Sequence, residues 1–227
     1  MHLPFPLFES PQIPSAAIDA TLSALSELVR TVAWWDGNTM EAAQSLRWQP
    51  LTLLFVVASM WWVKWPLIAV VGACGDARCR RKLPAAALAA VSAAGLAGLT
   101  VAILKTAFDR ARPPLADPAL DPVGTVPASA SFPSGHAATA FAAAVAVGVL
   151  FPRLRRPLLL LAALIAVSRV YLGVHFATDV LVGSLLGAAI GLAMGLAGRW
   201  ALPGPTALAP SLVPSGTSST LRRRSPA

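Results

Sequence analysis

Long apolar runs separated by short polar stretches dominate the chain from residue 49 onward. Five of these runs lie near residues 50–73, 84–104, 135–151, 157–173 and 178–198. A helix needs about 20 apolar residues to cross the hydrocarbon core of a bilayer, with a range of roughly 17–25. Each run meets that length, although Lys64 and Pro66 interrupt the first. The pattern therefore predicts an all-α polytopic transmembrane bundle of five spans, or of six if the N-terminal helix is also a span.

The first 48 residues follow a different pattern. Residues 1–14 contain four prolines and predict an irregular arm, and Ser15 is a candidate cap for the helix after it. Apolar residues then recur at helical spacing, at Ile18, Leu22, Leu25, Val29 and Val32. The predicted element is an amphipathic helix that lies flat in the membrane interface, with packing against the bundle as the alternative.

The composition agrees with a membrane-embedded chain of one domain. Of its 227 residues, 56% are hydrophobic and 12% are charged, and its mean hydropathy is +0.66. Soluble domains carry about 25% charged residues. We expect three parts: residues 1–48 as arm and helix, 49–200 as the transmembrane domain, and 201–227 as a disordered tail rich in Pro, Ser and Thr.

The basic residues form clusters between the apolar runs, which predicts membrane topology rather than a nucleic-acid surface. One side of the predicted bundle receives eleven of them against the single acid Asp76: Arg78, Arg80, Arg81, Lys82, Arg153, Arg155, Arg156, Arg199, Arg222, Arg223 and Arg224. The positive-inside rule assigns that side to the cytoplasm. Cys74 and Cys79 lie there, so no disulfide is expected. Their C-x4-C spacing has no further ligands, so no metal site is expected either.

The remaining unusual polar residues gather on the opposite, extracytoplasmic side. They stand at the ends of three predicted spans: Lys105, Arg112, Ser134, Gly135, His136, Arg169, His175 and Asp179. Three cations and two histidines at one membrane depth predict an anion site. Asp109 and Arg110, which lie between Lys105 and Arg112, are expected to form a local pair within the loop.

The spacing of these residues resembles a known family. Three motifs occur in order: Lys105–x6–Arg112–Pro113, then Pro133–Ser134–Gly135–His136, then Ser168–Arg169–x5–His175–x3–Asp179. This arrangement resembles the three-part signature of the type 2 phosphatidic acid phosphatase superfamily. All of these named positions match in the right order with the right internal spacing, so a chance match is negligible. The resemblance covers residues 105–179 and implies a helical bundle with a phosphatase site.

Phosphoryl transfer depends mainly on positioning and on charge stabilisation of the phosphate oxygens, and each residue suits a role. Lys105, Arg112 and Arg169 supply positive charge. Ser134 and Gly135 open a helix whose free N–H groups attract phosphate. His175 and Asp179, spaced i, i+4, are expected on one helical face, with the carboxylate holding Nδ1 and leaving Nε2 as the nucleophile. His136 is then the general acid and base.

The resemblance implies a metal-independent lipid-phosphate phosphatase without a cofactor, acting through a phosphohistidine. Expected substrates are undecaprenyl diphosphate, phosphatidylglycerol phosphate or phosphatidic acid, and the expected location is a bacterial inner membrane. The partners are the lipid substrate and membrane lipids, with no nucleic acid; the oligomeric state is open. A non-catalytic lipid-phosphate binding or transport protein is the alternative. Vanadium haloperoxidases share such a pocket, but they are soluble, which the apolar spans disfavour.

Overall fold

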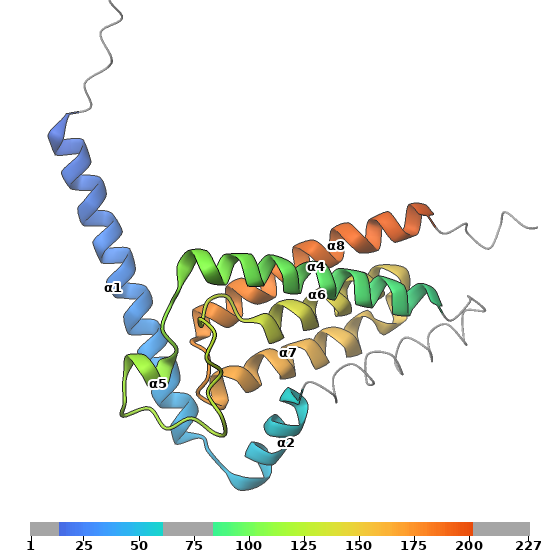
Figure 1. The fold of residues 1–227 in the computed structure, drawn as a ribbon, viewed down its shortest axis with the longest axis horizontal. Helices are drawn as coiled ribbons and strands as arrows, with labels where there is room; N and C mark the ends of the chain where they lie inside the picture. Colours follow the sequence, from blue (N-terminus) through green and yellow to red (C-terminus); the bar gives the residue numbers. More distant parts are fainter. Residues whose placement is uncertain (1–13, 61–83, 202–227) are drawn as a thin grey trace, which may run out of the picture.

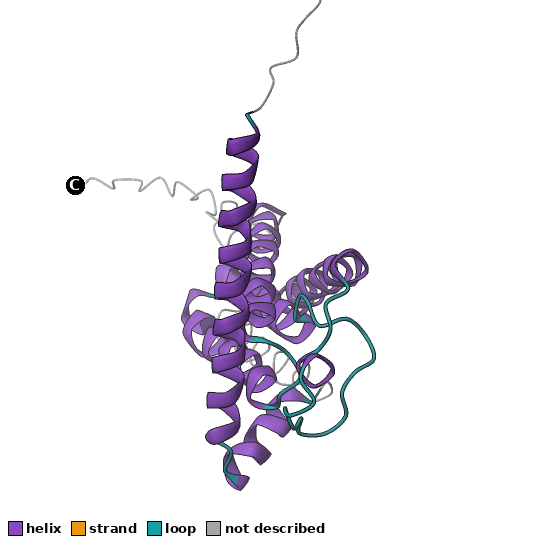
Figure 2. Ribbon diagram, turned by 90° about the vertical axis from the view of Figure 1, so that its left-hand side faces the viewer, coloured by secondary structure: helices purple, strands orange, loops and turns teal. Residues whose placement is uncertain are grey.

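The computed structural model describes residues 14–60 and 84–201, and these two ranges contain helices and loops only. Figure 2 shows no strand in the described part of the chain, so the predicted all-α class is confirmed there. In chain order the helices are α1 Ser15–Ser45, α2 Gln49–Ser59, α4 Pro84–Phe108, α5 Pro113–Ala116, α6 Gly135–Leu150, η1 Pro152–Leu154, α7 Arg155–Tyr171 and α8 Ala177–Ala201.

Four of these helices, α4, α6, α7 and α8, form a bundle around α6 (Figure 1). α6 contacts each of the other three and is buried along most of its length. Its buried side chains are mainly alanine, and α4 faces it with a row of alanines and one valine: Ala89, Ala90, Ala93, Ala94, Ala97 and Val101. The core is therefore built from small side chains, which bring the helix backbones close together.

A row of glycines on α8 explains why α8 and α6 have the most extensive contact in the bundle. Gly183, Gly187 and Gly191 recur every four residues, so they share one face of the helix. A Cβ at any of them would lie under 3.0 Å from a backbone oxygen of the α6 segment, that of Ala138 in the case of Gly187. Small residues at this spacing are typical of helix pairs in membranes, where close backbone approach replaces the hydrophobic driving force.

The outer faces of the bundle are as apolar as its interior, and their side chains are larger. On α4, Leu88, Leu99 and Ile103 are each at least 60% exposed, and Leu185 on α8 is 63% exposed. Two stretches, Ala87–Ala116 and Ala177–Trp200, are long and apolar enough to cross a membrane by length and composition. Large apolar side chains around a core of small ones suit a hydrocarbon surrounding, and they indicate an integral membrane protein.

The predicted apolar runs agree with the helices wherever the structure describes them. The runs at 84–104, 135–151, 157–173 and 178–198 correspond to α4, α6, α7 and α8, with ends that differ by at most four residues. The run at 50–73 is only partly described, because α2 ends at Ser59 and residues 61–83, with Lys64, Pro66, Cys74 and Cys79, lie outside the described residues. The number of spans, five or six, stays a prediction, as do the domain boundaries.

The N-terminal helix exists but is longer than its amphipathic pattern. α1 continues to Ser45, and Ser15 is its first helical residue rather than its cap, since Pro14 holds the cap position without a side-chain hydrogen bond. Side chains 16–35 are exposed. Beyond them, Asp36 and Met40 are buried, and α1 contacts α7 and α8 at one end of the bundle (Figure 1). The last third of the helix thus packs as the alternative predicted; an interfacial position for the exposed part stays a prediction.

α2 lies against α7 and is held there by one tyrosine. The hydroxyl of Tyr171 accepts the N–H of Trp48 at 3.0 Å and lies 2.9 Å from the hydroxyl oxygen of Thr52. The ring of Tyr171 also contacts the ring of Phe55, with centroids 4.6 Å apart. These contacts fix α2 beside the end of α7, next to the loops described below.

We expect Gly187→Ala to destabilise the bundle, because the new Cβ would overlap the carbonyl of Ala138. Overpacking costs about 1–3 kcal/mol, which exceeds the gain of about 1 kcal/mol that alanine brings to a helix. Gly95→Ala on α4 is the matched control, since its Cβ would meet nothing within 4 Å. Thermal unfolding in detergent should show a lower Tm for Gly187→Ala and an equal or higher Tm for Gly95→Ala. Equal effects in both variants would contradict the close packing.

Candidate active site

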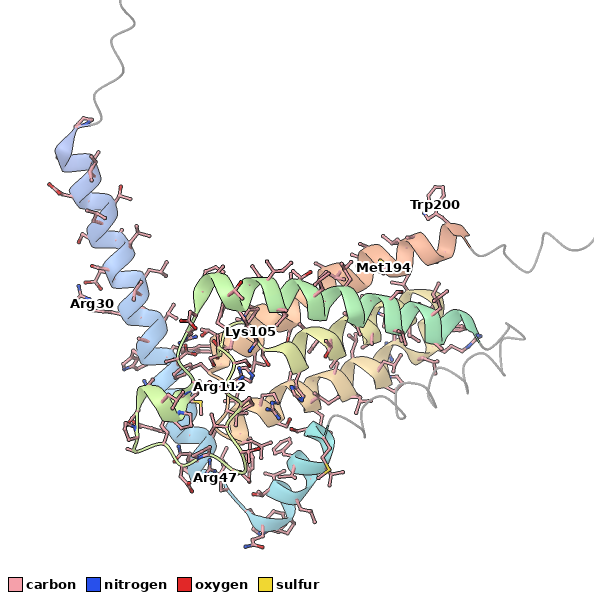
Figure 3. All side chains as sticks on the ribbon, in the orientation of Figure 1. Arg30, Arg47, Lys105, Arg112, Met194 and Trp200 are labelled. Atoms are coloured by element: carbon pink, nitrogen blue, oxygen red, sulfur yellow. The ribbon has the colours of Figure 1, made fainter. Side chains whose placement is uncertain are left out.

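The candidate site lies at one end of the bundle, where α4 and α7 finish and α6 and α8 begin (Figure 1). The loop between α4 and α6 covers this end. Figure 3 labels Lys105 and Arg112 there, and Met194 and Trp200 at the opposite end of α8. The predicted site residues lie near the ends of four helices, α4, α6, α7 and α8, where the sequence analysis had counted three span ends.

His175 and Asp179 are both buried, at 2% and 0% exposure. His175 lies in the turn between α7 and α8, and its Nδ1 is 3.5 Å from Oδ2 of Asp179. The prediction that both residues share one helical face was wrong in detail, because α8 begins only at Ala177. The helix starts there because Asp179, in its first turn, accepts the N–H of Phe176 at 3.0 Å. This bond turns the carboxylate back toward His175.

Arg112 contacts the other nitrogen of the same imidazole. Its Nη1 lies 3.2 Å from Nε2 of His175 and donates to the carbonyl of Val174 at 2.7 Å. A guanidinium only donates hydrogen bonds, so this contact requires an unprotonated Nε2 and places the proton of a neutral ring on Nδ1, facing Asp179. The tautomer that a nucleophilic Nε2 needs is therefore the one favoured by both neighbours.

Burial lowers the pKa of His175 from 6.5 to about 4. The hydrogen bond to Asp179 works in the opposite direction, while the positive charges of Arg112 and Arg169 lower the pKa further. Because burial and the two cations outweigh the carboxylate, the imidazole is neutral near pH 7. A neutral imidazole with a free Nε2 lone pair is the form that can attack an electrophile.

The other predicted cations surround this pair. Lys105 donates to the carbonyl of Ala130 and, at 3.3 Å, to the hydroxyl of Ser129, and Arg112 donates to the carbonyl of Ser129 at 2.8 Å. Arg169 donates through Nη1 to the hydroxyl of Ser59 on α2. All of these acceptors are neutral oxygens, so the three positive charges are left without a carboxylate among these contacts.

The start of α6 is fixed beside the start of α8. The N–H of Ser134 donates to the carbonyl of Asp179 at 3.0 Å, so it is not free for an anion, contrary to the prediction. The side chain of Ser134 is fully buried and makes no capping bond. His136, the second residue of α6, is partly buried and belongs to this same end. A Cβ at Gly135 would meet Val101 only at 3.6 Å, so packing does not require this glycine.

Two buried polar atoms at the site lack a hydrogen-bond partner among the described residues. They are Oγ of Ser134 and Nε of Arg169. Buried polar groups are nearly always paired, because an unpaired one costs about 1–3 kcal/mol. Both belong to residues predicted to bind an anion, and both can donate a hydrogen bond.

Three further residues take part that the sequence reasoning did not select. The hydroxyl of Ser131 donates to Oδ2 of Asp179 and lies 3.4 Å from Nδ1 of His175. Arg110 donates to Oδ1 of Asp179 at 2.7 Å and to Asp36 on α1 at 2.7 Å. The expected local pair of Arg110 with Asp109 was therefore wrong, because both acids that Arg110 binds are distant in sequence. No local pattern could have revealed them.

No group of three or more His, Cys, Asp or Glu residues that could hold a metal occurs in the described ranges 14–60 and 84–201. Two buried carboxylates, Asp36 and Asp179, are joined by Arg110 instead. Metal independence stays a prediction.

The chain is similar to known proteins in sequence and in fold. The model of the PAP2 superfamily matches residues 86–201. A decaprenylphosphoryl-5-phosphoribose phosphatase of Mycolicibacterium smegmatis is 39% identical over 123 residues, which is 52% of this chain and 62% of that protein. A lipid A 1-phosphatase of Rhizobium etli is 37% identical over 90 residues, 38% of this chain and 39% of that protein. The chain thus spans less than two thirds of either relative.

Among solved structures, a transmembrane PAP2-type phosphatidylglycerolphosphate phosphatase from Bacillus subtilis shares the fold. The TM-score is 0.59 at 23% sequence identity, and the match covers 83% of this chain and 96% of that one. The residues that the family model matches include all eight predicted site residues, from Lys105 to Asp179. Since that model covers just over half of the sequence, the chain belongs to the PAP2 superfamily.

Proposed function

We propose that the chain is a membrane lipid-phosphate phosphatase that hydrolyses a phosphate monoester or diphosphate through a phosphohistidine on His175. The observation that carries the proposal is the buried imidazole of His175, with Arg112 3.2 Å from Nε2 and Asp179 3.5 Å from Nδ1. These neighbours favour the neutral tautomer that carries its proton on Nδ1. The lone pair of Nε2 then faces the cationic side of the site.

The first half of the reaction transfers the phosphoryl group to the enzyme. Nε2 of His175 attacks phosphorus, a P–N bond forms, and the bond from phosphorus to the leaving oxygen breaks. His136 donates a proton to that oxygen. Arg112 and Arg169 bind the equatorial oxygens, and Lys105 adds a third positive charge. Asp179 stabilises the positive charge that the imidazole acquires as it attacks.

The second half regenerates the histidine. His136, now neutral, accepts a proton from water, whose oxygen attacks phosphorus while the P–N bond breaks. Inorganic phosphate leaves, and His175 returns to its neutral form. No step needs a metal ion or a cofactor in this scheme, because three basic side chains supply the charge stabilisation.

The unpartnered donors support an anionic ligand with several oxygens. Oγ of Ser134 and Nε of Arg169 are buried donors whose partners are missing among the described residues. A phosphoryl group has three terminal oxygens, each with more than one lone pair, and can satisfy both donors together with Arg112. A neutral substrate could not offset the cost of burying the positive charges of Arg112 and Arg169.

The proposed substrate is a lipid whose phosphate lies at headgroup depth, because the site is at the end of an apolar bundle. Undecaprenyl diphosphate, phosphatidylglycerol phosphate and phosphatidic acid are the candidates, and the names of the relatives add a decaprenyl-linked phosphate and the 1-phosphate of lipid A. We place the enzyme in a bacterial inner membrane, with the site on the extracytoplasmic face, from the distribution of basic residues.

The proposal is tested by phosphate release from purified full-length protein in detergent, with these five lipids supplied separately in EDTA. We expect turnover of at least one lipid, and loss of both turnover and acid-quenched phosphoenzyme in His175→Ala. Arg47→Met serves as the control, since Arg47 binds Asp121, which is not one of the predicted site residues. Lipid binding without phosphate release would favour the binding or transport alternative, and label on another residue would reassign the nucleophile.

His136→Ala should divide substrates by their leaving group. On an alkyl phosphate, the loss of the general acid should slow turnover by roughly 10²–10⁴-fold. On p-nitrophenyl phosphate the leaving group needs no proton, so the first step should be largely retained and phosphohistidine should accumulate, because water activation is impaired. Rapid-quench trapping of labelled enzyme measures both steps. An equal loss on both substrates, without accumulation, would contradict the assigned role.

The pH profile should report the lowered pKa of His175. Because its pKa is about 4 rather than 6.5, kcat/KM for p-nitrophenyl phosphate should persist well below pH 6.5 and fall only as the pH approaches 4. The same shift predicts how His175 affects the stability of the fold. Its contribution is fully present above pH 6.5, where His175 is neutral in the folded and unfolded states, and declines as the pH falls toward 4. Profiles of kcat/KM, corrected for ionisation of the substrate, and of Tm measure the two effects. An acid limb centred at 6.5 would contradict the shift.

A further inference from the structure

A carboxylate on the N-terminal helix reaches the catalytic end of the bundle. Asp36 of α1 is 1% exposed. Its Oδ1 accepts the N–H of Thr178 at 2.9 Å, and its Oδ2 accepts the hydroxyl of Thr178 at 2.6 Å. Oδ2 also accepts Nη2 of Arg110 at 2.7 Å. A buried aspartate on α1 thus accepts hydrogen bonds from groups of α8 and of the loop after α4.

The first of these contacts fixes the start of α8. Thr178 is the second residue of that helix, and its N–H is one of the four that no helical carbonyl can accept. A carboxylate at this position satisfies that N–H and interacts favourably with the positive end of the helix dipole. Asp36 therefore caps α8 from a different helix. The N–H that it accepts belongs to Thr178, the residue before Asp179.

The second contact holds Arg110 in a single orientation. Nη1 of Arg110 donates to Oδ1 of Asp179 at 2.7 Å and to the hydroxyl of Thr178 at 2.9 Å, while Nη2 binds Asp36. Its guanidinium also lies 4.2 Å from the ring centre of Phe176. The planar fork of arginine can bond two carboxylates at once, which an ammonium group cannot do with the same geometry.

These contacts form a chain from α1 to the nucleophile. Arg110 holds Oδ1 of Asp179, which leaves Oδ2 to face Nδ1 of His175 at 3.5 Å. We propose that Asp36 and Arg110 are positioning residues: they act through Asp179 to keep His175 in the reactive tautomer and orientation, and α1 is thereby part of the catalytic apparatus. The proposal rests on the proposed function for its kinetic consequences. Neither residue is proposed to touch substrate.

The kinetic test compares Arg110→Met with Arg47→Met, on the best lipid found in the phosphate-release panel. Both remove an arginine that links the N-terminal segment to the loop between α4 and α6, but only Arg110 contacts Asp179. Misplacement of a reacting group by about 1 Å can cost about 100-fold in rate. We expect Arg110→Met to lower kcat by about that factor with little change in KM, and Arg47→Met to leave both unchanged.

Two further variants separate positioning from general stability. Arg110→Lys should recover part of kcat, because an ammonium group can bind one of the two carboxylates. Asp36→Asn should fall between wild type and Arg110→Met, because its amide NH₂ faces a donor. In an Asp179→Asn background, Arg110→Met should change kcat by no more than about twofold, because coupled residues are non-additive and the carboxylate through which Arg110 acts is already gone. An undiminished loss in that background would overturn the proposal.

A readout that needs no substrate uses the three histidines of the chain. In protein labelled with ¹⁵N-histidine, the His175 signals are identified by their absence in His175→Gln. Wild type and Arg47→Met should show protonated Nδ1 and unprotonated Nε2, and Arg110→Met should show a mixture of tautomers. An unchanged single tautomer in Arg110→Met would overturn the positioning role, even if wild type releases no phosphate. If wild type releases no phosphate but Arg110→Met shows the expected mixture of tautomers, only the proposed function is contradicted.

Discussion

The candidate site depends on the carboxylate of Asp179, which is fully buried and accepts hydrogen bonds from two segments of chain. Arg110 and Ser131 reach it from the loop after α4, and the N–H of Phe176 from the turn before α8. A buried charge without such partners would be strongly destabilising. Its desolvation therefore obliges the loop and the turn to stay together, and the imidazole of His175 lies between them.

The glycine row on α8 makes this arrangement possible. Gly183 lies against the backbone of Ser134, so the first turns of α8 and α6 approach closely enough for the N–H of Ser134 to reach the carbonyl of Asp179. A larger residue would push the two helix ends apart. The geometry of the site thus depends on the packing of the bundle, because the glycines that let the helices approach also fix the distance between the motifs.

The helices could be predicted from the sequence because apolar runs of sufficient length have few alternatives in a membrane. The site residues could be selected because charged groups at span ends are rare and their spacing matches a family pattern. The contacts of Arg110 could not be predicted, since Asp36 is 74 positions away and its helix showed only an amphipathic pattern. The orientation of Ser134 was also beyond the sequence, because a helix-opening serine is usually a cap. Only the fold shows that its N–H is already occupied.

A core of alanine and glycine also has a thermodynamic meaning. Alanine and glycine have no side-chain rotamers to lose, so packing α6 against α4 and α8 costs almost no side-chain entropy. In hydrocarbon, transfer from solvent does not drive helices together, and association relies on van der Waals contact. A surface without rotamer freedom is ready for that contact before the helices meet. The bundle can therefore be rigid with a weak driving force, and the proposed nucleophile needs that rigidity to stay aligned between its two neighbours.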